Sequence, residues 1–225
     1  MNISENLNKL YHSIGKSVKL VAVSKTKSNE EIMEAYEAGQ KIFGENKVQE
    51  LVSKYNSLPK DIEWHMVGHL QKNKVKYIAS FIKLIHSVDN FKLLKEINRQ
   101  AKKYNVTIDC LLQIKIASEE TKFGLSIDQV KPMLESEEFK SLKNISIIGL
   151  MGMASFTNNE EILKNEFNYL NDFFDGLRVT YPNITVLSMG MSNDHKLAIQ
   201  YGSNMVRVGS LIFWERNYKI KLYTQ

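Results

Sequence analysis

Short apolar runs alternate with amphipathic segments along almost the whole chain. The runs are aliphatic and nearly continuous, a pattern typical of strands that are buried on both faces of a parallel sheet. Eight such runs predict eight strands. They span Val18–Ser24, Lys41–Phe43, Ile62–Val67, Leu84–Val88, Val106–Ile116, Ile145–Met153, Ile184–Met191 and Met205–Ile212.

The segments between the runs show the spacing of apolar residues that helices need. One apolar stripe extends from Ile3 to Ile14, before the first strand. Capping boxes at Ser28 and Ser126 mark the starts of two further helices. The helix that follows Ser28 is expected to stop at Gly39.

Eight strand–helix units after a leading helix predict an α/β fold, a (β/α)8 TIM barrel with an extra N-terminal helix. An open doubly wound sheet is the alternative, because the number of strands alone does not establish closure. The length of 225 residues fits one barrel. No internal repeat, low-complexity tract or linker divides the chain, so we expect one domain over residues 1–225.

Composition narrows the classes of function. The chain is 43% hydrophobic and 24% charged, as soluble globular proteins are. The net charge of +5 comes from lysines scattered along the chain, which disfavours nucleic acid as a partner and suits a small anionic ligand such as a phosphate ester. The five histidines are too scattered to predict a metal site.

The single cysteine and the apolar runs bear on location. Cys110 excludes an internal disulfide, fits a reducing compartment and, within an apolar run, is expected to be a buried, inert thiol. The N-terminus lacks a signal-peptide pattern, and no apolar run reaches the roughly 18 residues of a membrane span. We therefore expect a cytoplasmic protein with no membrane partner.

Lys25 follows the first apolar run, at the end of the strand where barrels carry their chemistry. One interpretation is a surface lysine that lays its stem along apolar surface. The other is a partly buried amine whose pKa is lowered by burial and a nearby cation, so that it attacks an aldehyde. Lys27 alternates with Lys25 along the strand and is expected to be a solvated charge that points away from it.

The last two runs end in small residues that could bind an anion. Gly190–Asp194 follows Ser188 and leads into a short helix, where backbone amides and the Ser192 hydroxyl are suited to a phosphate. Gly209 and Ser210 offer a second set of amides. Each motif alone is more typical of a simple turn. Together they match the phosphate sites that recur after the seventh and eighth strands of such barrels.

Three further polar residues lie inside apolar runs. Arg207 needs a partner there, because an unpaired buried guanidinium is costly. It either forms a salt bridge within the barrel or lies beside a ligand as a fixed cation. His65 and His86 are more typical of core histidines than of catalysts. We assign no role to His86 from these patterns.

Six ordered motifs resemble the pyridoxal 5′-phosphate (PLP) homeostasis protein family, and they extend from the first strand to the last. The motifs are Val23–Lys27, Phe43–Glu50, Trp64–Lys74, Gly149–Met151, Gly190–Ser192 and Val206–Gly209. The resemblance implies an alanine-racemase N-terminal-domain-like TIM barrel, without that enzyme's second domain. The cofactor-binding residues expected on this basis are Lys25, Asn46, His65, Met151, Ser188, Ser192, Arg207, Gly209 and Ser210.

The resemblance also implies roles for some of these residues. Lys25 matches the lysine that holds PLP as a Schiff base, the internal aldimine. Ser192, Gly209 and Ser210 match the phosphate site, and Arg207 matches an arginine beside the pyridine nitrogen. Such proteins buffer and deliver PLP and affect amino-acid and keto-acid balance, and they are not known for robust turnover.

The expected partners are therefore PLP and PLP-dependent client enzymes, and a monomer is expected because the dimer surface of racemases needs the second domain. An arginine beside the pyridine nitrogen keeps it unprotonated and weakens the cofactor as an electron sink. A PLP-dependent amino-acid racemase is the first alternative. A cofactor-free aldolase, in which Lys25 attacks a sugar phosphate, is the second.

Three positions depart from the family pattern. Ser28 replaces a common proline, Phe123 replaces a smaller or polar residue, and Trp214 replaces a usual glycine. The tryptophan needs room, so the packing near the end of the barrel is the part that the resemblance does not predict.

Overall fold

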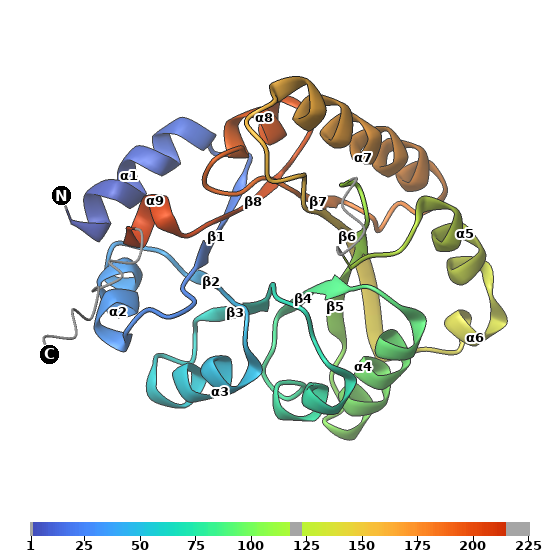
Figure 1. Ribbon diagram of the computed structural model, residues 1–225. Helices are drawn as coiled ribbons and strands as arrows, with labels where there is room; N and C mark the ends of the chain where they lie inside the picture. Colours follow the sequence, from blue (N-terminus) through green and yellow to red (C-terminus); the bar gives the residue numbers. More distant parts are fainter. Residues whose placement is uncertain (1, 118–122, 215–225) are drawn as a thin grey trace, which may run out of the picture.

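The computed structural model describes residues 2–117 and 123–214, in which eight parallel strands form a closed barrel (Figure 1). Each strand pairs with the next, and β8 pairs with β1 over four residues. This last pairing excludes the open sheet and confirms the predicted (β/α)8 barrel. The strands are β1 Lys19–Val23, β2 Ile42–Glu45, β3 Glu63–Met66, β4 Leu84–Val88, β5 Ile108–Ile114, β6 Ile145–Gly152, β7 Val186–Ser188 and β8 Met205–Val208.

Helices surround the barrel, and α1 lies beside α9 near the junction of β1 and β8 (Figure 1). Both capping boxes are confirmed, with Ser28 at the start of α2 and Ser126 at the start of α5. The helices are α1 Ile3–Ile14, α2 Asn29–Glu37, α3 Val48–Ser57, α4 Phe91–Lys103, α5 Ile127–Glu135, α6 Glu137–Lys140, α7 Glu160–Thr180, α8 His195–Gln200 and α9 Ser210–Phe213, with the 3-10 helix η1 Lys72–Tyr77 after β3.

The eighth apolar run does not form one long strand. β8 ends at Val208, and Ser210–Phe213 turns into α9. Ile212 and Phe213 remain buried because α9 packs on α1, where the Asn6 side chain donates to the Ile212 carbonyl at 3.1 Å. The apolar character of this segment therefore reflects helix packing rather than a strand.

The apolar core has two parts, separated by the wall of the barrel. Outward-facing residues such as Phe43 and Trp64 are fully buried against the helices. Inside the barrel, a smaller cluster includes Val21, Leu111 and Met151. Because neighbouring residues of a strand face opposite sides, the residues next to the outward-facing ones fill the interior and form the floor below the barrel mouth.

Two expectations from composition can be compared with this structure. Cys110 is fully buried on β5, and burial raises the pKa of its thiol, as expected for an inert cysteine. Within the part of the chain that the structure describes, no helix is both long and apolar enough to cross a bilayer.

Candidate functional site

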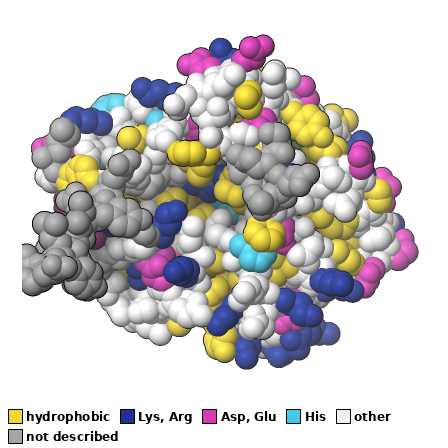
Figure 2. Space-filling model, viewed as in Figure 1, with side chains coloured by type: hydrophobic (Ala, Val, Ile, Leu, Met, Phe, Trp, Pro, Cys, Tyr) yellow, Lys and Arg dark blue, Asp and Glu magenta, His cyan; other side chains and the backbone are white. Residues whose placement is uncertain are grey.

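A cavity of about 660 Å³ opens at the carboxyl-terminal mouth of the barrel. Figure 2 shows this face hollowed near the barrel axis, with lysine or arginine side chains in and beside the hollow. The volume is in the range of sites that hold a small molecule. The lining residues are Val23, Lys25, Thr26, Lys27, Asn46, Val67, Met153, Met191, Ser192, Arg207, Gly209, Ser210 and Trp214.

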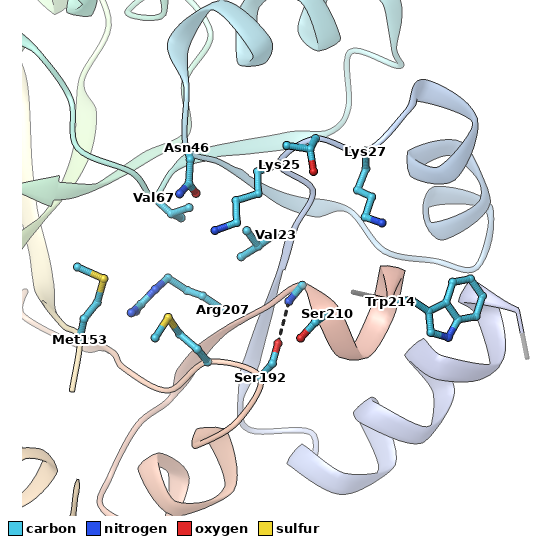
Figure 3. Close-up of a pocket in the computed structure, with 13 residues that line it drawn as sticks. Val23, Lys25, Lys27, Asn46, Val67, Met153, Ser192, Arg207, Ser210 and Trp214 are labelled. Carbon is cyan, nitrogen blue, oxygen red and sulfur yellow. Dashed lines mark hydrogen bonds between the residues drawn. The ribbon is translucent and has the colours of Figure 1, made fainter. Parts of the chain in front are cut away.

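Lys25 is the second residue of a turn formed by Ser24–Lys27, which we call the amine turn. The Lys27 amide donates to the Ser24 carbonyl at 3.0 Å and closes the turn. The Lys25 side chain points into the cavity (Figure 3) and has no hydrogen bond or ion pair with any residue that the structure describes. The expectation of a partly buried amine is wrong, because the cavity around Lys25 is open and the residue is exposed.

Lys27 is not the solvated charge that strand alternation predicts. Its Nζ donates to the Phe213 carbonyl at 2.7 Å and lies 3.3 Å from a Glu31 carboxylate oxygen, and its side chain is only 17% exposed. The prediction fails because β1 ends at Val23 and Thr26 has a φ of +67°, so the alternation of the strand does not continue to Lys27. Lys27 instead connects the amine turn to the end of α9.

Two turns after β7 and β8 line the cavity with Met191–Ser192 and Gly209–Ser210; we call them the cradle turns. The Gly209 amide donates to Ser192 Oγ at 3.4 Å and links the two (dashed line in Figure 3). Ser210 begins α9, so its amide has no acceptor within the helix. A Cβ on Gly209 would lie 2.9 Å from the Val23 carbonyl oxygen, so only glycine lets this turn pass so close to β1.

Arg207 forms part of the cavity floor and is 4% exposed. Its Nη1 donates to Ser188 O at 2.9 Å and Ser188 Oγ at 2.7 Å, and its Nη2 donates to Gly152 O at 3.0 Å. Burial lowers its pKa to about 10, and the charge of Asp194 opposes this shift, so the guanidinium is cationic at neutral pH. Its hydrogen-bond partners in the described structure are neutral oxygens, which argues against the salt-bridge interpretation.

A chain of hydrogen bonds continues from Arg207 into the barrel interior. Ser188 Oγ lies 3.2 Å from His86 Nδ1, and His86 Nε2 lies 3.0 Å from His65 Nδ1. Burial lowers the pKa of His65 to about 3 and that of His86 well below its usual value, with neighbouring positive charges contributing in both cases. Because both rings are neutral, the chain is satisfied if Ser188 donates to His86 and His86 donates to His65.

The fixed geometry of Arg207 gives a testable consequence for stability. Arg207→Lys keeps the charge but cannot reproduce three hydrogen bonds from one planar group. We expect the free energy of unfolding to fall by about 2–3 kcal/mol, measured by urea denaturation. Arg99→Lys is the matched control, since Arg99 is exposed and its side chain pairs with the neighbouring Glu96 carboxylate. Equal effects of the two substitutions would contradict the role described for Arg207.

Six of the nine predicted binding residues line the cavity. They are Lys25, Asn46, Ser192, Arg207, Gly209 and Ser210. The other three, His65, Met151 and Ser188, are buried in the barrel interior and do not line it. Two residues beyond His65 and Met151 along the chain, Val67 and Met153 line the cavity instead.

That two-residue offset is the signal by which the sequence could have identified Val67 and Met153. Successive inward-facing positions of a strand are two residues apart. The family motifs contain His65 and Met151, but only the next inward-facing position of each strand reaches the mouth of the barrel. Ser188 supports Arg207 directly, and His65 supports it through His86.

The three departures from the family pattern have separate structural settings. Ser28 caps α2, as expected for a change at a helix start. Phe123 is 57% exposed and stacks on His69, with ring centroids 4.3 Å apart. Trp214 ends α9 with a φ of +59° and finds its room at the edge of the cavity, which it lines. Within residues 2–117 and 123–214, no group of three or more His, Cys, Asp or Glu residues is arranged to hold a metal ion.

Comparisons with known proteins agree with this geometry. The family described as "Alanine racemase, N-terminal domain" matches residues 1–217. The pyridoxal phosphate homeostasis protein of Aquifex aeolicus is 38% identical over 231 aligned positions, covering 97% of this chain and 100% of that protein.

Solved structures give the same result. PipY of Synechococcus elongatus PCC7942 has a TM-score of 0.88 and 34% identity without PLP, and a TM-score of 0.84 and 33% identity with PLP bound. Both comparisons cover 94% of this chain and 100% of PipY. An alanine racemase of Clostridium difficile 630 is only 15% identical and shares the fold, with a TM-score of 0.81 over 97% of this chain and 58% of the racemase.

Proposed function

This chain belongs to the alanine racemase N-terminal domain family and, within it, to the pyridoxal phosphate homeostasis proteins, and from this membership we propose that it binds PLP and takes part in PLP homeostasis. One observation carries the proposal. A single cavity brings together the amine of Lys25, the cradle turns at Ser192 and Gly209, and the buried cation of Arg207.

The donors in the cavity fit each part of PLP. The cofactor supplies an aldehyde that condenses with a primary amine, and Lys25 is an amine without a competing partner among the described residues. The Ser192 hydroxyl and the amides of the cradle turns are suited to hold its phosphate. Arg207 can only donate hydrogen bonds, so beside the pyridine nitrogen it would favour the unprotonated ring.

We propose a carrier rather than an enzyme with established turnover. Racemisation needs an acid or base on each face of the substrate carbon. Among the described lining residues the titratable groups are Lys25, Lys27 and Arg207. Lys27 is engaged by Phe213 and Glu31, and Arg207 by Ser188 and Gly152, so Lys25 is left as the available base. Loss of optical activity from a panel of L-amino acids would favour the racemase alternative.

The same proposal covers the setting in which the protein works. We propose that residues 1–225 act as one domain, as a monomer in the cytoplasm, and deliver PLP to client enzymes without nucleic acid or membrane as a partner. Size-exclusion chromatography with light scattering, at micromolar concentration, tests the monomer. A stable dimer would contradict that part of the proposal without affecting PLP binding.

The experiment that tests PLP binding is a spectrum of the purified protein after incubation with PLP and removal of the free cofactor. We expect a visible absorption band, and borohydride reduction followed by peptide mapping should place the adduct on Lys25. A bare protein with no band would favour the cofactor-free aldolase. An adduct on a different lysine would overturn the assignment of the site.

The cradle turns predict selectivity for the phosphate. Ser192→Ala is expected to weaken PLP binding about tenfold, because one hydrogen bond to a charged group is lost. The affinity for pyridoxal, which has no phosphate, should change little. Equilibrium titrations of both ligands followed by absorbance provide the measurement, and equal affinity of the unmodified protein for PLP and pyridoxal would discredit the cradle.

A further inference from the structure

The amine turn has an unfavourable backbone conformation at its third residue. Thr26 has a φ of +67°, and this position of such a turn is normally taken by glycine or asparagine. A β-branched residue there is strained. The surrounding structure must therefore hold Thr26 in place, and the conformation of Thr26 determines where the neighbouring Lys25 points.

Three charged residues, Glu45, Glu50 and Lys54, surround the base of the amine turn; we call them the buried trio. Lys54 Nζ lies 2.7 Å from each of three acceptors, Glu45 Oε1, Glu50 Oε1 and the Ser24 carbonyl oxygen. The side chains of Lys54 and Glu45 are 6% and 0% exposed, and that of Glu50 is 24% exposed. The trio thus joins the end of β2 and helix α3 to the start of the amine turn.

The trio contacts the backbone on both sides of Lys25. Before it, the Ser24 hydroxyl donates to Glu45 Oε1 at 2.6 Å, while the Ser24 carbonyl accepts from Lys54. After it, the Thr26 amide donates to Glu50 Oε1 at 2.5 Å. The Lys25 side chain itself lacks a polar contact in the described structure. The direction of the Lys25 side chain is therefore set by the backbone at Ser24 and Thr26.

We propose that the buried trio positions Lys25 for reaction with PLP, and that Glu50 is the member that holds Thr26 in the conformation that aims the amine into the cavity. This inference deepens the proposed function and rests on it. Glu50 is a positioning residue, because it acts through the Thr26 backbone and does not line the cavity.

The free-energy cost of burying the charges of the trio supports a specific role for them. Glu45 Oε2 is buried and has no hydrogen-bond partner among the described residues, and burial raises the pKa of this carboxyl despite the neighbouring Lys54. Buried charges contribute little net stability compared with apolar packing. A purely structural link between β2 and α3 could be apolar, whereas holding two backbone groups of the amine turn requires donors and acceptors at these positions.

Glu50→Ala tests the proposal. Alanine favours helices and Glu50 is partly exposed, so the variant is expected to fold, which circular dichroism checks. We expect the rate of PLP capture, followed by absorbance and by borohydride-trapped adduct on Lys25, to fall about tenfold. Hydrogen exchange of the amide at position 26 should accelerate by about the same factor, because its acceptor is lost.

Two further variants separate positioning from a general loss of charge. Adding Thr26→Gly to Glu50→Ala removes the strain at the positive φ, and should restore capture to within about twofold while the amide still exchanges fast. Glu50→Gln keeps an acceptor oxygen and should behave like the unmodified protein. Glu138→Ala on α6, which breaks an exposed ion pair with Lys95 on α4, is the matched control and should change neither measurement.

The outcomes distinguish this inference from the proposed function. Capture at the unmodified rate in Glu50→Ala, or failure of Thr26→Gly to restore it, would overturn the positioning role. If the unmodified protein itself captures no PLP, the proposed function fails, and the exchange rate at position 26 still decides whether Glu50 holds the turn.

Discussion

Lys25→Ala is expected to abolish covalent retention of PLP and to leave the free energy of unfolding unchanged. The substitution removes the amine that faces the cradle turns across the cavity. It should not disturb the fold, because the side chain is exposed and makes no polar contact with the described residues. The amine turn keeps its closing hydrogen bond between Lys27 and Ser24, which uses backbone atoms only.

The measurement compares adduct mass after borohydride reduction with urea denaturation of the same preparations. Lys103→Ala, at the exposed end of α4, is the control and should retain the full adduct. A variant without Lys25 that still formed the adduct in equal yield would show that another amine captures the aldehyde. Loss of stability together with loss of adduct would instead indicate a structural role for Lys25.

Acidification from pH 7 to pH 5 is expected to lower the free energy of unfolding through His65 and His86, by up to about 2 kcal/mol for His65 alone. The folded pKa of each imidazole is depressed, to about 3 for His65, whereas the unfolded value is near 6.5. The unfolded chain therefore binds more protons below pH 6.5, and stability is lost as the pH falls toward the folded pKa. At pH 5 this amounts to up to about 2 kcal/mol for His65, and the depressed pKa of His86 acts in the same direction.

Urea denaturation at several pH values between 5 and 7 measures this effect. The double variant His65→Asn, His86→Gln should show a shallower dependence on pH, although it is less stable at pH 7 because the chain from Ser188 is broken. His12→Gln, at an exposed position on α1, should keep the full dependence. Identical slopes for the double variant and the unmodified protein would rule out the buried imidazoles as the cause.

The sequence predicted the barrel well because parallel strands and their covering helices leave separate periodic patterns. All eight runs overlap a strand, but the ends of the runs were less reliable. The run at Ile184–Met191 yields only Val186–Ser188, since Ile184 before the strand and Met189 after it are buried although they lie outside the strand. For the same reason the sequence did not show that the last run leaves the strand after Val208 and continues into α9.

The sequence predicted which residues line the cavity where those residues lie in loops after a strand. It did not do so for residues within strands, because their distance from the mouth depends on where each strand ends. Lys25, Ser192 and Gly209 lie in loops at the mouth, so their position needed only the order of the strands. His65 and Ser188 required knowledge of how far each strand extends. The buried trio was missed because Lys54 belongs to a helix, and helical lysines are normally solvated.

The pairing of β8 with β1 brings together two halves of the site that lie far apart in the sequence. Lys25 follows the first strand, whereas Ser192, Arg207 and Ser210 belong to the last two strand–helix units. With the proposed site, a chain still being synthesised has Lys25 long before it has the cradle turns that would hold the phosphate. The vitamin B6 coenzyme can therefore be bound tightly only after the barrel has closed. Its binding would stabilise the completed fold but could not direct the early steps of folding.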